Sequence, residues 1–189
     1  MTQIDKTATN TACPSVLQAR DIALGGLFGA LAIALPILFH ALGLGKLFLP
    51  MYLPILALGL LVSWPVAALV GLIAPVISAL LTGMPPMAPP IAFIMMGELA
   101  ALATGASLAR SKGLGIYPAT LIGILASRIV GVLMLVTLGR ALGFGQSVYE
   151  FAIAGFILSW PGVLLQLTCV PGAVYIIERT SMIGYKKRG

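Results

Sequence analysis

The sequence predicts an all-α integral membrane protein, a single bundle of six transmembrane helices with both termini in the cytoplasm. Three observations lead to this fold class: 60% of the 189 residues are hydrophobic, only 8% are charged, and the apolar residues form long continuous runs. A soluble domain carries roughly 25% charged residues, so this chain lacks the polar surface that water requires. The composition therefore excludes a soluble enzyme, a nucleic-acid-binding domain and a disordered tail.

Six apolar segments are separated by polar or proline-rich breaks. In lipid a segment must satisfy its own backbone hydrogen bonds, so each is expected to be a helix. The second segment is short, and prolines after the third prevent a regular helix there. The expected spans are residues 22–42, 51–62, 65–81, 91–109, 114–139 and 151–177. They form one domain, 22–178, between a polar N-terminal tail, 1–21, and a basic C-terminal tail, 179–189.

The positions of Lys and Arg predict the orientation. With six spans, both termini share a side with the second–third and fourth–fifth connections. That side holds eight cations: Lys6, Arg20, Arg110, Lys112, Arg179, Lys186, Lys187 and Arg188. The opposite side holds Lys46 and Arg140, and Arg128 falls inside a span. Because cytoplasmic loops carry the excess of Lys and Arg, the termini are expected in the cytoplasm, and the net charge of +6 needs no nucleic-acid partner.

Two ionisable residues, Glu98 and Arg128, lie well inside expected spans. At a rise of 1.5 Å per residue they lie roughly 10 Å and roughly 16 Å below the outer surface, so an ion pair between them is expected. The pair could be structural, or one or both charges could face a ligand in an outward-opening cavity. A buried pair stabilises a fold poorly compared with apolar residues, which favours the ligand-binding interpretation.

Four further polar or aromatic residues are candidates for ligand contact. His40 is expected at the outer end of the first span and Tyr52 at the outer start of the second. Trp160 and Gln166 are expected about nine residues into the sixth span and midway along it. A Trp or Tyr at such depth can stack on a flat ligand, although packing is the more frequent role.

The inventory of reactive residues disfavours an enzyme, and the expectation is that the chain is not one. A Ser-His-Asp site would need His40, but Asp5 and Asp21 are expected on the other side of the membrane. A zinc site needs about three converging ligands, which a single His and two distant Cys residues do not supply. The chain has no Walker motif, so ATP hydrolysis for active transport would have to come from another subunit. No cofactor and no metal site are expected.

Small residues form two stripes on the first span. Gly26, Ala30 and Ala34 recur at four-residue spacing, as do Gly25 and Gly29. Such small-xxx-small faces let another helix approach closely. Packing inside the bundle is the default interpretation, and the alternative is a face for a partner subunit.

Four segments together carry a resemblance to a known family. They are the polar stub leading to Gly26-xxx-Ala30; Leu53-Pro54-Ile55-Leu56-Ala57-Leu58-Gly59-Leu60; the run from Gly71 through Pro75 and Ser78 to Thr82-Gly83-Met84-Pro85-Pro86, with Met96-Gly97-Glu98-Leu99-Ala100; and Ser127-Arg128-Ile129-Val130-Gly131. Over about residues 20–180 the chain resembles the substrate-binding S component of an energy-coupling factor (ECF) vitamin transporter.

The resemblance implies a six-helix S-component fold in a bacterial or archaeal plasma membrane. It also implies a vitamin or related small molecule bound near the outer face, and assembly with a transmembrane T subunit and two ABC ATPases. Gly26-xxx-Ala30 lies where the family has its Ala-xxx-Ala coupling motif, which implies that this helix slides against the T subunit. The ligand stays open among a pyridoxine-like compound, cobalamin and a queuosine precursor.

Two other functions remain open from the residues alone. The first is a small integral-membrane enzyme acting on lipid or isoprenoid substrates. Such enzymes usually cluster Asp or His near one face, whereas this chain has one buried acid and one outer His. The second is a scaffold without a ligand, which the two intramembrane charges disfavour.

Overall fold

The computed structural model describes residues 19–41, 43, 50–83, 85, 91–141 and 159–186, with the backbone alone for residues 40, 139, 140 and 181–186. This part of the chain is all-helical. Its helices are α1 (Ala19–Ala41), α3 (Tyr52–Leu61), α4 (Trp64–Thr82), α5 (Ile91–Ser111), α6 (Ile116–Ala141) and α8 (Trp160–Lys186).

The helix boundaries agree closely with the expected spans except in α8. That helix continues to Lys186, past the expected end at residue 177, so most of the basic C-terminal segment is helical. Glu178 pairs with Arg110 of α5, which gives this polar part of α8 a contact outside the apolar span. The expected start of the last span at residue 151 lies outside the described residues.

The described helices have the character of a membrane bundle. Five of them (α1, α4, α5, α6 and α8) are long and apolar enough to cross a membrane. Large apolar side chains cover their outer faces, and Leu80, Leu125 and Ile176 are each more than half exposed. Because a soluble surface of this kind would aggregate, these faces indicate contact with lipid. The structure is therefore that of a multi-pass helical membrane protein.

Helix α3 is the central element of the bundle although it is the shortest. Its ten residues extend about 15 Å, half of the roughly 30 Å hydrocarbon core, so it does not span the membrane by itself. It contacts each of the other five described helices, and eight of its residues are buried. A helix that is apolar all round is stable when neighbours cover every face. This accounts for the uninterrupted apolar sequence of α3.

Close backbone contacts fasten three helices to α5. A Cβ atom built on Gly59 of α3 would lie 2.6 Å from the Ala103 carbonyl oxygen, and one on Gly71 of α4 would lie 2.8 Å from the Leu99 carbonyl oxygen. On α6, a Cβ at Gly123 would lie 2.7 Å from the Leu102 carbonyl oxygen. These positions exclude every larger residue, and they bring helices together in the way that small residues do in membranes.

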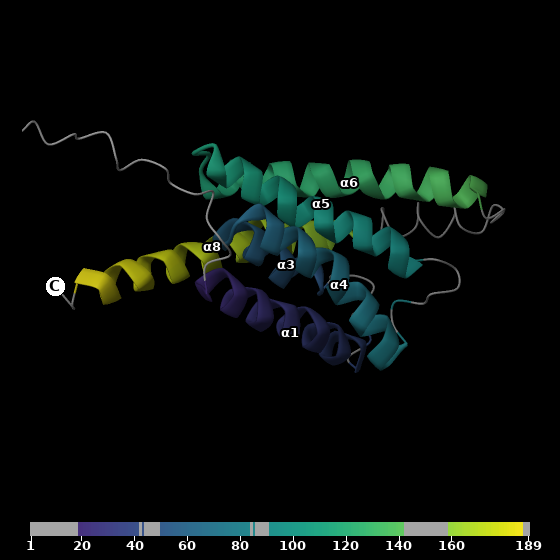
Figure 1. Ribbon diagram of the computed structural model, residues 1–189, viewed down its shortest axis with the longest axis horizontal. Coiled ribbons are helices and arrows are strands. Elements are labelled where there is room, and N and C mark those ends of the chain that lie inside the picture. Colours follow the sequence, from purple (N-terminus) through teal and green to yellow (C-terminus); the bar gives the residue numbers. More distant parts are fainter. Residues whose placement is uncertain are drawn as a thin grey trace, which may run out of the picture.

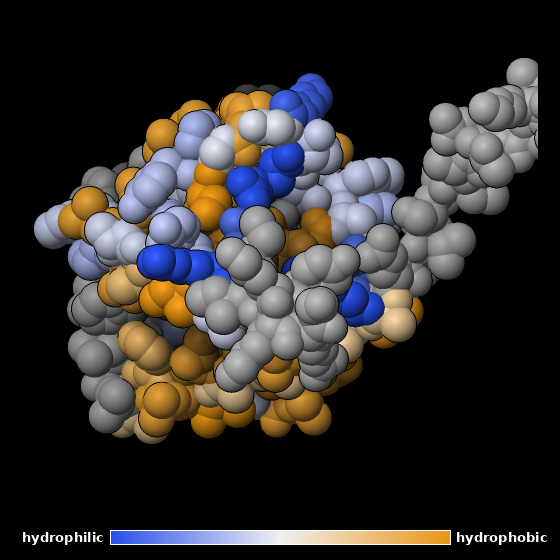
Figure 2. Space-filling model, turned by 90° about the vertical axis from the view of Figure 1, so that its left-hand side faces the viewer, coloured by the Kyte–Doolittle hydropathy of each residue, from blue (hydrophilic) through white to orange (hydrophobic). Residues whose placement is uncertain are grey.

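The polar residues gather at one end of the bundle, where the described chain both begins and ends (Figure 1). The start of α1, the α3–α4 junction, the α5–α6 turn and the part of α8 around Glu178 meet there, and the last turns of α8 extend beyond it. We call it the charged end; its charged residues include Arg20, Asp21, Arg110, Lys112 and Glu178. Figure 2 views this end and shows hydrophilic residues gathered on it above hydrophobic flanks.

A buried carboxylate ties the charged end together. Asp21 in the first turn of α1 is 8% exposed and accepts hydrogen bonds from the Ser63 amide at 3.0 Å and the Ser63 hydroxyl at 2.6 Å. Ser63 precedes α4, so its amide is one of the donors that a helix start leaves without an intrahelical partner. Ser107 of α5 donates to the Val62 carbonyl oxygen at 2.7 Å. The α3–α4 junction is thus held from two sides.

Candidate ligand-binding site

Glu98 of α5 meets Tyr52 of α3 in the middle of the bundle. The Tyr52 hydroxyl donates a hydrogen bond to Oε2 of Glu98; Tyr52 is 3% exposed, and Glu98 is half-buried. Tyr52 was expected at the outer start of its span. Helix α3 ends at the charged end of the bundle, and its start lies only about 15 Å from there. Its first residue therefore lies deep in the bundle. A buried Tyr hydroxyl usually finds such a partner.

The backbone of α6 makes room for the Glu98 carboxylate. A Cβ atom built on Gly131 would lie 2.7 Å from Cδ of Glu98 and closer still to Oε1. No residue other than glycine leaves this space, so Gly131 is part of the site. Next to Glu98, Gly97 packs on Met134, with its built Cβ 3.2 Å from Cγ of that side chain. The carboxylate is thus held between a hydroxyl on one helix and bare backbone on another.

Arg128 lies one helical turn from Gly131, on the same side of α6. Its charge acts on the Glu98 carboxylate, but the two residues do not form the direct ion pair that their depths led us to expect. Glu98 is bonded to Tyr52 instead, and Nη2 of Arg128 donates to the Ser159 hydroxyl at 3.3 Å. Ser159 directly precedes α8, and its carbonyl oxygen accepts from the Val163 amide. Arg128 therefore links α6 to the start of α8.

A cavity of about 360 Å³ lies between α6 and α8, next to Arg128. It is lined by Arg128 and Trp160 together with the apolar side chains of Ile124, Val163 and Leu164. Trp160 is the first residue of α8 and is 63% exposed. Two of the residues expected to contact ligand therefore share one cavity, which combines a cation, an aromatic ring and apolar walls. Glu98 is not among its lining residues.

Gln166 is the most deeply buried of the expected site residues. It is 1% exposed, and its amide nitrogen has no hydrogen-bond partner among the described residues. A buried donor without a partner costs roughly 1–3 kcal/mol, so a water molecule or a ligand that accepts from this group would be stabilising. Gln166 follows Val163 of the cavity wall by three residues, which places both on one side of α8. It lines neither of the two cavities described here.

The remaining expected residues divide between α1 and the undescribed part of the chain. The side chain of His40 lies outside the described residues. Gly26, Ala30 and Ala34 all lie exposed on the outer face of α1, and no atom approaches a Cβ built on Gly26 within 4 Å. Gly25 and Gly29 instead face Val66 and Val70 of α4. The two small-residue stripes thus have different surroundings, one inside the bundle and one outside.

Sequence reasoning overlooked three contributors to this site and to the charged end. Gly131 follows Arg128 by one helical turn, a spacing that could have placed it beside the charges. Ser159 precedes the helix start at Trp160-Pro161, a position where serine is favoured. Asp21 had been considered only as a distant carboxylate, and no sequence pattern points to its bond with Ser63, 42 residues away. Among the described residues no group of His, Cys, Asp and Glu is arranged to hold a metal ion.

Comparisons of the chain with protein-family models, with curated proteins and with solved structures found no match.

Proposed function

We propose that this chain is the substrate-binding subunit of an ABC importer of the energy-coupling factor type. It takes up a vitamin or a related small polar molecule inside the helical bundle, at the plasma membrane of a bacterium or archaeon. A transmembrane T subunit and two ATPases complete the transporter and supply ATP hydrolysis. The charged end faces the cytoplasm with both termini, and α3 belongs to the second of six crossings.

The observation that carries this proposal is the environment of Glu98. A charge inside a membrane protein is costly and usually has a function. A carboxylate that served only to neutralise an arginine would form a direct ion pair, whereas Glu98 accepts from a neutral hydroxyl and lies against bare backbone. No direct ion pair with a described residue neutralises the Glu98 carboxylate, which suits a site for a polar or cationic group of a ligand. Arg128 and Trp160, in the adjacent cavity, supply a cation and a stacking surface for the remainder of the ligand.

The outer face of α1 supports the assembly with a T subunit. Gly26, Ala30 and Ala34 form a smooth exposed stripe, while the second stripe of the same helix already packs on α4. In lipid, helices associate through close packing of small residues. An exposed stripe of this kind fits a second membrane protein that slides along α1.

Retention of a ligand through purification tests the proposal. We expect native mass spectrometry of the gently purified protein to detect a bound small molecule. The double variant Glu98→Gln with Arg128→Met removes both charges and leaves neither one alone. It should fold but lose the ligand, because the polar groups of the ligand would meet no charged partner in the bundle.

The matched control removes one carboxylate and one arginine at the charged end, through Arg110→Met with Glu178→Gln. It changes the charge of the protein equally and should leave the ligand in place. A folded Glu98–Arg128 double variant that retains the ligand as well as the wild-type protein would contradict the site. Absence of ATPase activity from the complex purified with the tagged chain would contradict the transporter.

A further inference from the structure

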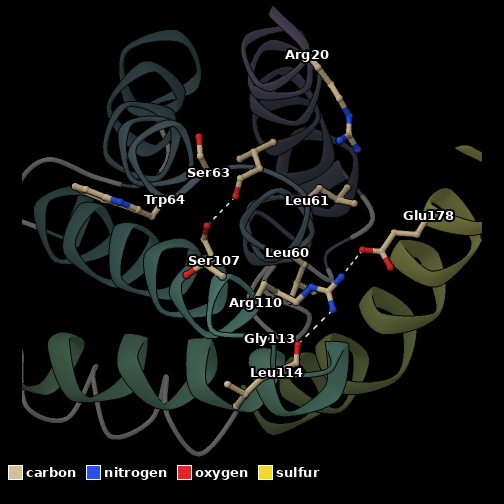
Figure 3. Close-up of a pocket in the computed structure, with 12 residues that line it drawn as sticks. Arg20, Leu60, Leu61, Ser63, Trp64, Ser107, Arg110, Gly113, Leu114 and Glu178 are labelled. Carbon is tan, nitrogen blue, oxygen red and sulfur yellow. Dashed lines mark hydrogen bonds and ion pairs between the residues drawn. The ribbon is translucent and has the colours of Figure 1, made fainter. Parts of the chain in front are cut away.

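A second cavity lies at the charged end, at the other end of α3 from the Tyr52–Glu98 contact. Its volume is about 640 Å³. The end of α3 lines it with Leu60 and Leu61, and arginines enter from the start of α1 (Arg20) and the end of α5 (Arg110) (Figure 3). Glu178 of α8 lies beside Arg110 (Figure 3).

The helices on the two sides of this cavity do not pack against each other. In the described bundle α1 contacts α3 and α4, and α8 contacts α3 and α6, but α1 and α8 make no contact. Arg20 belongs to α1 and Glu178 to α8, so the cavity lies where these two helices diverge over the end of α3. Figure 3 shows α1 and α8 on different sides of the end of α3. The cavity therefore lies over the end of α3, beside the gap between α1 and α8.

The cavity has an excess of positive charge. Arg110 donates through Nη2 to Glu178 at 2.5 Å and through Nη1 to the Leu114 carbonyl oxygen at 3.4 Å. A guanidinium has five N–H donors, so donors remain for a further acceptor. Arg20 is exposed and has no hydrogen-bond or ion-pair partner among the described residues. Among the residues that line the cavity, two arginines and one glutamate are charged, which gives the lining a net charge of +1.

The position of the cavity along the bundle matches the membrane surface. It lies at the ends of the membrane-crossing helices, and Trp64 at its edge is 52% exposed. Tryptophan is enriched at the level of lipid headgroups. Leu60, Leu61 and Leu114 give the cavity apolar walls, and Leu60 belongs to the core of the bundle.

We propose that this cavity binds the phosphodiester headgroup of an anionic phospholipid, with Arg20 and Arg110 as its ligands and an acyl chain along the apolar wall. Arginine suits phosphate because its planar fork forms paired hydrogen bonds. Basic pockets between transmembrane helices bind acidic lipid headgroups in this way. The leucines that line the cavity and the exposed Trp64 beside it favour a lipid over a free phosphate ion, which would need neither.

Lipid titration of the purified protein in neutral detergent tests this site. We expect phosphatidylglycerol to raise the melting temperature and to remain bound in native mass spectra, and phosphatidylcholine and inorganic phosphate to do neither. Arg20→Gln should weaken retention of phosphatidylglycerol about tenfold or more, the range of a lost charge-assisted contact. Arg110→Met with Glu178→Gln should weaken it similarly, without leaving an unpaired Glu178.

Lys112→Gln is the matched control, because Lys112 is an exposed cation at the same end that does not line the cavity. It should leave retention unchanged. If Arg20→Gln and Lys112→Gln weaken lipid retention equally, the effect is one of general surface charge and the proposed site is wrong. So would unchanged retention in both cavity variants, or a melting-temperature increase with inorganic phosphate as large as that with the lipid. Arg20 has no hydrogen-bond or ion-pair partner among the described residues, so Arg20→Gln removes no such contact and is expected to fold. A change in its lipid retention therefore reports on binding.

Discussion

Glu98 is accommodated in an apolar bundle by groups from two neighbouring helices. The Tyr52 hydroxyl donates to one carboxylate oxygen, and the absent side chain of Gly131 leaves the space in which the other oxygen lies. Arg128 acts on the same carboxylate through its charge, without a direct ion pair. The position of Glu98 therefore depends on glycine at 131 as well as on its polar neighbours.

At the residue scale, we predict that Gly131→Ala displaces the Glu98 carboxylate. The added methyl group would overlap it, so the melting temperature should fall by an amount equivalent to about 1–3 kcal/mol, and ligand retention should decrease. Gly172→Ala adds the same group where no atom lies within 4 Å and should have little effect. A double-mutant cycle with Glu98→Ala, measured by thermal unfolding, tests this prediction. Gly131→Ala should lower the stability little when Glu98 is already alanine. If the two substitutions lower the stability additively, the proposed overlap between the methyl group and the carboxylate is wrong.

At the scale of elements, the sequence pattern of α3 matches its surroundings, whereas the pattern of α1 does not distinguish its buried side from its exposed side. Helix α3 is apolar on all sides and lies at the centre, in contact with every other described helix. Helix α1 presents Gly25 and Gly29 to α4 and leaves Gly26, Ala30 and Ala34 exposed. Two stripes with nearly the same composition thus face opposite surroundings.

We predict that Gly26→Trp combined with Ala30→Trp prevents assembly of the transporter while the chain still folds. The large rings would occupy the exposed stripe and separate α1 from a partner helix. Leu31→Trp is the control, because Leu31 is already a bulky exposed residue on the same helix. The measurement is the ATPase activity that purifies with the tagged chain. Undiminished activity with the double variant would show that this stripe is not the interface.

At the scale of the whole molecule, the bundle is polarised along its length. The described chain begins and ends at the charged end, and the α3–α4 and α5–α6 connections lie there as well. Five helices cross from this end to the other, and α3 occupies the half of the bundle nearest to it. The excess of Lys and Arg at this end favours the cytoplasmic side.

We predict that a cysteine at position 88 reacts with an impermeant thiol reagent added to intact cells, in a background lacking Cys13 and Cys169. Ala88 lies in the proline-rich connection expected on the outer side. A cysteine at Ser111, in the last turn of α5 at the charged end, should react only after the cells are permeabilised. The reverse labelling pattern would invert the orientation.

The sequence by itself determined that this is a helical membrane protein, and it determined most helix boundaries. Both follow from local properties. In a long apolar run the backbone must form its own hydrogen bonds, and Ser63-Trp64-Pro65 interrupts such a run whatever the tertiary structure around it. Depth estimates also brought Glu98 and Arg128 into the same neighbourhood, since a helix rises by a constant amount per residue.

Only the tertiary structure decided which partners these residues have. Tyr52 reaches Glu98 because α3 is a half-length helix at the centre of the bundle, and periodicity does not reveal where a uniformly apolar helix lies. The Asp21–Ser63 bond and the Arg110–Glu178 pair join residues 42 and 68 positions apart, and rotation of each helix about its axis sets these contacts. In α1 the two small-residue stripes look alike in sequence, and only the packing of α4 distinguishes the buried one from the exposed one.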